Sequence, residues 1–500
     1  MLTRTLPSGI TSTWTYDAAG RRTGLDVAGR EMAFERDAVG RAVAQAFAGG
    51  VVASAFDAAG RVTHRSFGND GHKASWSVDY GYAPSGELLT AHDSASGRRE
   101  YALDVLGRIE RVGAGASERY GYDAAGNVTA AAWGGPHDGS GAAQGERVLD
   151  GALVRVAGRD HLEHDAAGRL VRRRRRLLSG GSKEWTFSWG AGDRLREVTT
   201  PDGATWRYGY DVLGRRVSKS QVLDDGSVGE SVLFAWDGPV LVEQVRSGPG
   251  APAEVSVWEH EDWSPVAQLR GTVPPGEGLV LAEGSSAWVD AQFAAIVTDL
   301  VGSPVRVVSD EGDLVWSGSA SVWGLQPAGA SVMPLRLPGQ YADDETGLHY
   351  NLFRYYDPTT ARYVSPDPLG LEPSPNAYTY PANPTTELDP FGLAPCGPLP
   401  RPQVEDAALR NTVDELYRAV DAVDRTGNGT TMDAIRHELA TGEMVKGKPH
   451  FAKGVERRRA LVRWIRRHPE ASFHDQLVAR SLAMELNDVL GGSPIRIPGL

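Results

Sequence analysis

The sequence contains a single cysteine, Cys396, which excludes an internal disulfide framework and any paired-cysteine metal site. It has no run of ~18 apolar residues, and its N-terminus lacks the apolar core of an export signal, so we expect neither a membrane span nor a signal peptide. His161 and His164 lie near an aspartate but lack a third ligand. We therefore expect no metal and no cofactor.

The charge is distributed unevenly along the chain. The net charge is −12, yet residues 401–500 carry 16 Lys/Arg against 14 Asp/Glu, so the first 400 residues hold the whole acidic excess. With 60 glycines and 30 prolines the chain is rich in turns, while 41% hydrophobic residues are enough to form cores. At 500 residues, this asymmetry indicates at least two parts with separate roles.

An aromatic-rich strand followed by Asp-x-x-Gly-Arg, with Asn in place of Arg in the copy at Asp123, recurs through the first 290 residues. The intervals are roughly 20 residues, with a copy at 82–86 that lacks the aspartate and two gaps of about two periods each. Aspartate can cap a tight turn, and glycine three positions later can adopt a positive φ, so each copy predicts a β-hairpin. Aromatic residues two positions apart, such as Tyr120 and Tyr122, share one strand face that stacked neighbours can bury. The copies begin at Asp17, Asp37, Asp57, Asp104, Asp123, Asp165 and Asp211.

These turns, their spacing and their aromatic flanks resemble the YD repeats of Rhs proteins and of the C component of Tc toxins, which coil into a hollow β-shell. The resemblance implies a mainly β fold, with a hairpin array over residues 1–290 forming a partial shell and a small α-helical domain after it. A generic β-solenoid or propeller is the alternative. The arginines from Arg172 to Arg176 alternate between strand faces, so we interpret them as solvated or cargo-facing charge, not as a nucleic-acid patch.

Residues 291–393 carry a second set of motifs. Leu-Arg-Leu-Pro-Gly-Gln-Tyr at 335–341 and Arg-Tyr-Tyr-Asp-Pro at 354–358 precede two near-copies, Asp-Pro-Leu-Gly at 367–370 and Asp-Pro-Phe-Gly at 389–392, which 18 residues separate. This arrangement resembles the RHS repeat-associated core, in which the paired motifs act as an aspartyl peptidase on their own chain. The resemblance implies that Asp367 and Asp389 are catalytic and that the cut falls after Leu393.

Paired carboxylates suit this chemistry because two of them held close together share a proton. One then activates water while the other protonates the scissile carbonyl or the leaving amine, and a bond in the same chain is already within reach. A single Asp-Pro-x-Gly is an ordinary turn, so the prediction depends on the second copy. Arg362 is a candidate to orient Asp367, although Ala361 stands where the family pattern has glycine.

Residues 394–402 are rich in proline and predict a linker. In residues 403–500 apolar residues recur at helical spacing between glycine and proline breaks, which predicts a small α-helical domain. We expect four helices, over about 413–423, 430–440, 451–468 and 472–490.

Nine Lys/Arg against one Glu lie between positions 446 and 467, with Phe451 and Trp464 interleaved. This concentration suits a polyanion, and together with the variable C-terminal toxins of the family it favours a nuclease acting on RNA or DNA. An equally plausible interpretation is a solvated helix face with capping histidines. The candidate residues are His450 as general base, Lys453 or Arg436 to stabilise a phosphorane, and Glu438 or His437 as partner of the base.

We interpret the chain as a polymorphic toxin in which a β-repeat carrier cuts itself and releases a C-terminal effector. The resemblance implies a cognate immunity protein, a secretion or delivery partner, and delivery to a target cell. A ~100-residue cargo needs a wall that ~390 residues supply only if every one of them lies in a strand, and turns make that impossible, so we expect at most an open bowl. A non-enzymatic surface or carbohydrate-binding repeat protein and an inert shortened copy are the alternatives, and toxicity of residues 401–500 in a bacterium would distinguish them.

Overall fold

The computed structural model divides the chain into two compact units. The β unit comprises Met1–Asp367 and Ser374–Pro395, and the helical unit comprises Pro368–Pro373 and Cys396–Leu500. The structure describes residues 1–68, 76–113, 117–134, 140–273, 289–326, 332–371, 374–393, 404, 406–417, 430–432, 434, 435, 438, 444–471, 475, 476, 478–480, 482, 483, 486 and 490.

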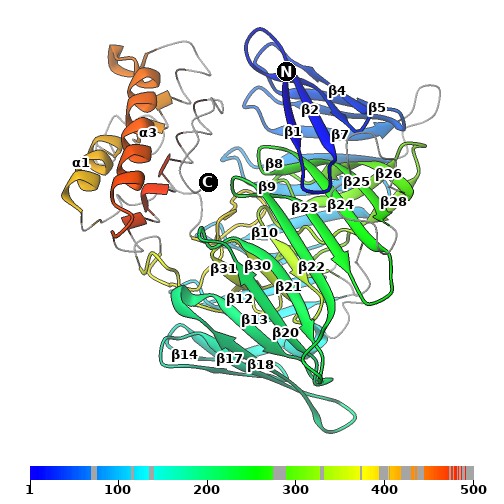
Figure 1. Cartoon of the computed structure of the whole chain (residues 1–500), viewed down its shortest axis with the longest axis vertical. Helices are drawn as coiled ribbons and strands as arrows, with labels where there is room; N and C mark the ends of the chain where they lie inside the picture. Colours follow the sequence, from blue (N-terminus) through cyan, green and yellow to red (C-terminus); the bar gives the residue numbers. More distant parts are fainter. Residues whose placement is uncertain are drawn as a thin grey trace. The chain divides into compact units, whose positions relative to one another are not determined.

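The β unit contains a 28-stranded antiparallel sheet in which each strand pairs with the next one along the chain. This meander (Figure 1) follows from the repeated turns, because each tight reversal returns the chain beside the strand it has just left. The first fourteen strands are β1 (Leu2–Thr5), β2 (Thr11–Tyr16), β3 (Arg22–Val27), β4 (Arg30–Arg36), β5 (Ala42–Phe47), β6 (Gly50–Phe56), β7 (Val62–Gly68), β8 (Trp76–Tyr82), β9 (Leu88–Asp93), β10 (Gly97–Leu103), β11 (Ile109–Val112), β12 (Glu118–Tyr122), β13 (Val128–Trp133) and β14 (Gly145–Asp150).

The second half of the sheet has the longest strands, up to ten residues in β22, β25 and β26. The meander continues to Ser317, beyond the residue at which the repeat motifs end in the sequence. These strands are β15 (Leu153–Ala157), β16 (Asp160–His164), β17 (Leu170–Arg176), β18 (Ser182–Trp189), β19 (Leu195–Thr199), β20 (Thr205–Tyr210), β21 (Arg216–Val222), β22 (Val228–Asp237), β23 (Val240–Ser247), β24 (Ala253–Glu261), β25 (Ser264–Val273), β26 (Val289–Thr298), β27 (Pro304–Ser309) and β28 (Leu314–Ser317), with short 3₁₀ turns η1 (Ser140–Ala143) and η2 (Ala191–Asp193).

The Asp-x-x-Gly-Arg turns have the geometry that the sequence predicts. At the first copy, Asp17 accepts hydrogen bonds from the backbone N–H groups of Ala19 and Arg21, both at 2.9 Å, and Gly20 has φ 78°. The arginine has a second function, because Arg41 stacks over Phe56 of the following copy at 4.5 Å, and Arg61 stacks over Tyr82 at 4.6 Å. These two turns therefore join their own hairpins to the next ones.

Several hydrophobic cores form because the meander folds back on itself, and two of them are large. The first core packs the early strands, including Trp14 and Phe34, against strands β23–β27, and Arg4 crosses this interface to Glu259. The second core packs strands β12–β20 against the core segment, defined here as residues 318–326, 332–367 and 374–393, through residues such as Trp206 and Tyr356. Repeat strands thus pack against the part of the β unit that carries Asp367 and Asp389.

The core segment forms its own four-stranded sheet of β29 (Tyr341–Asp343), β30 (Leu348–Asn351), β31 (Arg354–Asp357) and β32 (Arg362–Tyr363). Every residue of β30, β31 and β32 is buried, because repeat strands cover them. Arg173 from the arginine run donates to the carbonyl of Thr346 and stacks over Trp185 at 4.4 Å. The arginines do alternate between faces, but Arg173 contacts the core segment, so on this face the expectation of solvated or cargo-facing charge is wrong.

In the helical unit, α1 (Ala407–Leu416) and α3 (His450–Arg467) pack side by side, and η3 (Val445–Gly447) precedes α3 (Figure 1). Asp406 caps α1 by accepting from Leu409 N–H at 2.8 Å, and it also accepts from the indole N–H of Trp464 at 2.7 Å. The predicted helix over 451–468 is confirmed within one residue, and the first helix begins earlier than expected, at Ala407. The linker, Cys396 and parts of the other two predicted helices lie outside the described residues. None of the described helices is long and apolar enough to cross a membrane.

Candidate active site

A tight hairpin between β30 and β31 forms one wall of the site. Asn351 pairs with Arg354, so only Leu352 and Phe353 form the turn, and Leu352 has φ 44°, which a branched side chain rarely adopts. The N–H of Phe353 donates to the carbonyl of Phe391 at 3.1 Å, which ties the hairpin tip to the second Asp-Pro-x-Gly motif. The hairpin therefore points Asn351 and Arg354 at that motif.

Arg354 holds the two motif aspartates together. Its Nη2 atom lies 2.8 Å from Oδ2 of Asp367 and 3.4 Å from Oδ2 of Asp389, and all three side chains are at most 4% exposed. The guanidinium lies 3.6 Å from the ring centre of Tyr363, and its Nη1 donates to the carbonyl of Ala377 at 3.0 Å. One fixed cation thus contacts both carboxylates out of water.

Both oxygens of Asp389 accept hydrogen bonds. The hydroxyl of Tyr363 donates to Oδ2 at 2.7 Å, and the backbone N–H of Leu393 donates to Oδ1 at 3.0 Å. Asn351 Nδ2 donates to the Asp389 carbonyl at 2.8 Å and to the Tyr363 hydroxyl at 2.9 Å. This carboxylate therefore binds directly to the residue that precedes the predicted cut.

Close packing fixes the second motif beneath the hairpin. Gly392 has φ 68°, its carbonyl accepts from Nε of Arg354, and a Cβ there would lie 2.5 Å from the carbonyl oxygen of Asn351. A Cβ on Gly339 would lie 2.1 Å from the carbonyl oxygen of Pro390. Glycine is required at both positions because other backbone occupies the space of a side chain.

Asp367 reaches Arg354 from the opposite side, where the backbone of residues 374–380 returns beside β32. Its N–H donates to the carbonyl of Ala377 at 2.8 Å, the same carbonyl that accepts from Arg354. Burial, together with the neighbouring Asp389 carboxylate, raises the pKa of Tyr363 well above its usual value. Tyr363 is therefore a neutral hydrogen-bond donor at physiological pH.

The other predicted residues of this region lie elsewhere. Arg362 donates to Asn127 Oδ1 at 3.4 Å and to the carbonyl of Ala152, so it ties β32 to the repeats, and Arg354 contacts Asp367 instead. The reason is alternation along β32, where Tyr363 and Arg362 point to opposite faces. Ala361, at the expected glycine position, has φ 58°. Leu393 is buried at 6% exposure.

Sequence reasoning missed Arg354, Tyr363 and Asn351. Arg354 stands in the Arg-Tyr-Tyr-Asp-Pro motif, but neither charge nor spacing indicated that this arginine faces the carboxylates. A usable signal was the two-residue gap between β30 and β31, since paired strands place Asn351 and Arg354 at one hairpin tip.

The helical unit brings together one predicted pair. Glu438 Oε1 lies 2.8 Å from Nδ1 of His450, and the Glu438 carboxylate also accepts from the N–H groups of His450 and Phe451 at 2.7–3.0 Å. Burial alone would raise the pKa of Glu438, but these hydrogen bonds hold it below its ordinary value. The carboxylate both caps α3 and orients the imidazole.

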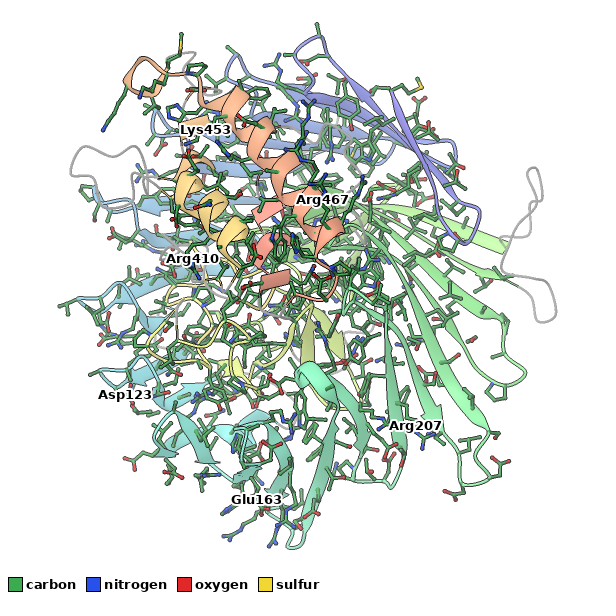
Figure 2. The ribbon with its side chains drawn as sticks, turned by 60° about the vertical axis from the view of Figure 1, so that its left-hand side comes forward. Asp123, Glu163, Arg207, Arg410, Lys453 and Arg467 are labelled. Atoms are coloured by element: carbon green, nitrogen blue, oxygen red, sulfur yellow. The ribbon has the colours of Figure 1, made fainter. Side chains whose placement is uncertain are left out.

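The remaining tail candidates are not part of this pair. Lys453 donates to the Glu415 carbonyl at 2.9 Å and lies 3.4 Å from its carboxylate, so it joins α3 to α1. It lies toward one end of α3 and Arg467 toward the other (Figure 2). Arg436 and His437 lie outside the described residues. Exposed arginines, including Arg459, Arg463 and Arg467, follow the outer face of α3.

Comparisons with known proteins agree with this architecture. The RHS Repeat family profile matches residues 179–227. The chain is 34% identical over 341 residues to Double-stranded DNA deaminase toxin A of Burkholderia cenocepacia (strain H111), covering 63% of this chain and 22% of that protein. It is 28% identical over 394 residues to Probable deoxyribonuclease RhsA of Dickeya dadantii (strain 3937), covering 77% and 25%. The chain thus spans about a quarter of the length of these relatives.

A solved structure shares the fold. The Photorhabdus luminescens Tc holotoxin pore, determined with a TccC3 variant, superposes with a TM-score of 0.55 at 17% identity, covering 79% of this chain and 21% of that one. Consecutive hairpins with Asp-x-x-Gly turns around a buried core segment define a YD-repeat β protein. The profile match and the Rhs-named relatives confirm the resemblance to Rhs, or YD-repeat, proteins seen in the motifs of this chain.

Proposed function

We propose that this chain is a toxin precursor that cuts its own backbone after Leu393 and frees residues 394–500 as an effector. The observation that carries this proposal is the contact of Asp367 and Asp389 with one guanidinium, together with the hydrogen bond from the Leu393 amide to Asp389. The toxin names of the relatives support the general activity. A delivery partner and an immunity protein belong to the same proposal.

The charges of the site suit an acid–base pair. Two buried carboxyl groups and one buried guanidinium become neutral when one carboxyl carries a proton, and burial favours the neutral state. The ionised carboxylate takes a proton from a water molecule as that water attacks the Leu393 carbonyl carbon. The protonated carboxyl then gives its proton to the leaving nitrogen of residue 394 as the C–N bond breaks, leaving a new carboxylate and a new amine.

The neighbouring groups keep this arrangement in place. Arg354 prevents the two carboxylates from separating, and Tyr363 and the Leu393 N–H fix the orientation of Asp389. Since the scissile bond follows the anchored residue, the reacting groups meet without a binding step.

Intact-mass measurement of the purified full chain tests the peptidase. We expect the wild type to separate into residues 1–393 and 394–500, and Asp367→Asn and Asp389→Asn to remain uncut. Asp357→Asn is the matched control, because Asp357 is equally buried and also precedes proline, but its carboxylate binds Thr359. Cleavage at the wild-type position in both motif variants would refute the proposal.

For the effector, the Glu438–His450 contact favours a hydrolase that uses His450 as general base, and the exposed arginines suit a nucleic-acid backbone. Purified full chain would be incubated with DNA and with RNA, beside His450→Ala and, as a control, Arg207→Ala on the exposed repeat surface. Loss of degradation in His450→Ala alone supports the base. Harmless expression of residues 401–500 in a bacterium, with no degradation of either nucleic acid, would favour the adhesion or inert-copy alternatives.

A further inference from the structure

Several arginines of the repeat sheet reach into the core segment and donate to its carbonyl groups. Arg147 binds the carbonyls of Thr359 and Thr360 at 2.8 and 2.7 Å, and Arg194 binds the carbonyl of Leu352 at 3.0 Å. The contact of Arg194 lies next to the candidate site, because Leu352 is the residue with φ 44° at the hairpin tip between Asn351 and Arg354. A repeat residue thus contacts the turn that positions the site.

The repeats hold Arg194 on several sides. It follows the short turn η2, where its carbonyl accepts from Gly190 N–H at 2.8 Å. Its guanidinium lies 5.7 Å from the ring centre of Tyr210 and 5.1 Å from that of Phe353 in the tip. It also crosses the face of Gly214, where an added Cβ would lie 1.8 Å from Nη2.

The connection from Arg194 to the site runs through contacts already described. The carbonyl of Leu352 points at Arg194 only while the tip keeps its left-handed backbone, and the adjacent Phe353 N–H binds Phe391 of the second motif. The same tip sets the directions of Asn351 and Arg354, which bind Asp389. A tip released by Arg194 can relax its φ and move both side chains by the ~1 Å that matters in catalysis.

We propose that Arg194 is a positioning residue for self-cleavage, through which the folded repeat layer makes the site competent to cut. This inference rests on the proposed peptidase. Cleavage then requires that the repeat containing η2 and Arg194 is folded against the core segment, so a chain with unfolded repeats does not release its C-terminal part.

The test follows the cutting of full-length chain made by pulsed cell-free translation, measured as the uncut fraction over time. We expect Arg194→Ala to slow cleavage by ~10–100-fold, equivalent to ~1.4–2.7 kcal/mol of barrier. Arg194→Lys should recover part of the rate, since lysine can still donate to the carbonyl. Arg207→Ala is the control, because Arg207 is 63% exposed and pairs with Glu197 on the repeat surface.

A second pair of variants perturbs the same contact without removing the arginine. Gly214 and Gly107 both end Asp-Val-Leu-Gly turns, with φ 80° and 79°, but an added Cβ meets Arg194 only at Gly214 and nothing within 4 Å at Gly107. Alanine at either position carries the same backbone penalty. We expect Gly214→Ala to slow cleavage and Gly107→Ala to leave the rate unchanged.

The outcomes separate this inference from the proposal beneath it. If Asp389→Asn still cuts, the peptidase itself is wrong. If Asp389→Asn is uncut but Arg194→Ala and Gly214→Ala cut at the wild-type rate, only the positioning role is overturned. Melting temperatures are compared in the uncut Asp389→Asn background, and an Arg194→Ala loss much larger than that of Arg207→Ala would assign Arg194 a merely structural role and also overturn the inference.

Discussion

Asp343 joins the repeats to the core segment through a fully buried ionic cluster. Its carboxylate lies 2.5 and 2.9 Å from the guanidinium of Arg216 and 3.0 Å from Nζ of Lys219, and Lys219 also pairs with Glu345 at 2.8 Å. Exposure of these side chains is 0–6%. Asp343→Asn removes one of two negative charges and leaves a buried cation without its counter-ion.

The expected loss is large because the remaining charge stays out of water. Breaking a buried ion pair from one side costs about 3–5 kcal/mol. For the β unit, of about 390 residues, an unfolding entropy of ~2.1 cal/mol/K per residue gives ~0.8 kcal/mol/K, so the melting temperature should fall by ~4–6 °C. The exposed pair Asp150–Arg155 supplies the control, and Asp150→Asn should lower it by no more than ~1 °C.

The loss of stability caused by Asp343→Asn should also depend on pH. Burial alone would raise the pKa of Asp343, but Arg216 and Lys219 together hold it below its ordinary value. A lowered pKa means that the folded state resists protonation, so this stabilisation is complete above the ordinary carboxyl pKa of 3.8 and is lost as the pH falls through the lower folded value. The difference in melting temperature between wild type and Asp343→Asn should therefore become smaller as the solution is acidified below pH ~4.

Melting followed by tryptophan fluorescence, at pH 7 and in steps down to pH 3, measures both effects. A shift for Asp343→Asn no larger than that for Asp150→Asn would refute the reasoning, since it would mean that the cluster does not hold the core segment. A difference in melting temperature that becomes larger in acid would contradict the lowered pKa of Asp343.

Two further changes test individual residues by the same melting assay. Ala361→Gly should stabilise the chain by about 0.5–1 kcal/mol, because Ala361 has φ 58°, which glycine adopts without strain. Ala131→Gly in strand β13 is the control and should destabilise the chain. A destabilised Ala361→Gly would contradict backbone strain at position 361. Burial, Arg155 and Arg362 lower the pKa of His164 to about 4, so wild-type stability should fall between pH ~6.5 and ~4 as the unfolded state takes up the proton. His164→Gln should reduce this acid-side loss of stability by ~2 kcal/mol, and a wild-type pH profile unchanged by His164→Gln would refute the assignment.

The repeat layer was predictable because its determinants are local. An aspartate that caps its own turn and a glycine with positive φ act within five residues, so the hairpins and their sequential pairing follow from the motif. The same holds for α3, whose apolar spacing and terminal proline define its bounds to within one residue. The sheet's continuation to Ser317 uses the same kind of turn, since Asp299 accepts from the N–H groups of Val301 and Ser303 and Gly302 has φ 100°.

The site was predictable only in part. The repeated Asp-Pro-x-Gly motif identified Asp367 and Asp389, but the choice of Arg354 over Arg362 depends on which face of β31 and β32 meets the carboxylates. That choice is made by packing against the repeats, which take up Arg362 at Asn127 and Ala152. In the helical unit, the approach of Glu438 to His450 across twelve positions likewise depends on how the helices pack.

By itself the sequence determined the hairpins and the helical character of the C-terminal part, because each arises from residues adjacent in the chain, whereas the paired aspartates followed from the resemblance to the RHS repeat-associated core. The tertiary structure decided what surrounds those aspartates: a cation from one hairpin, a hydroxyl from another strand, and a repeat arginine at the strained turn behind them. Such contacts join residues tens to hundreds of positions apart, and they form only when burial excludes water and each charge must find its partner within the fold.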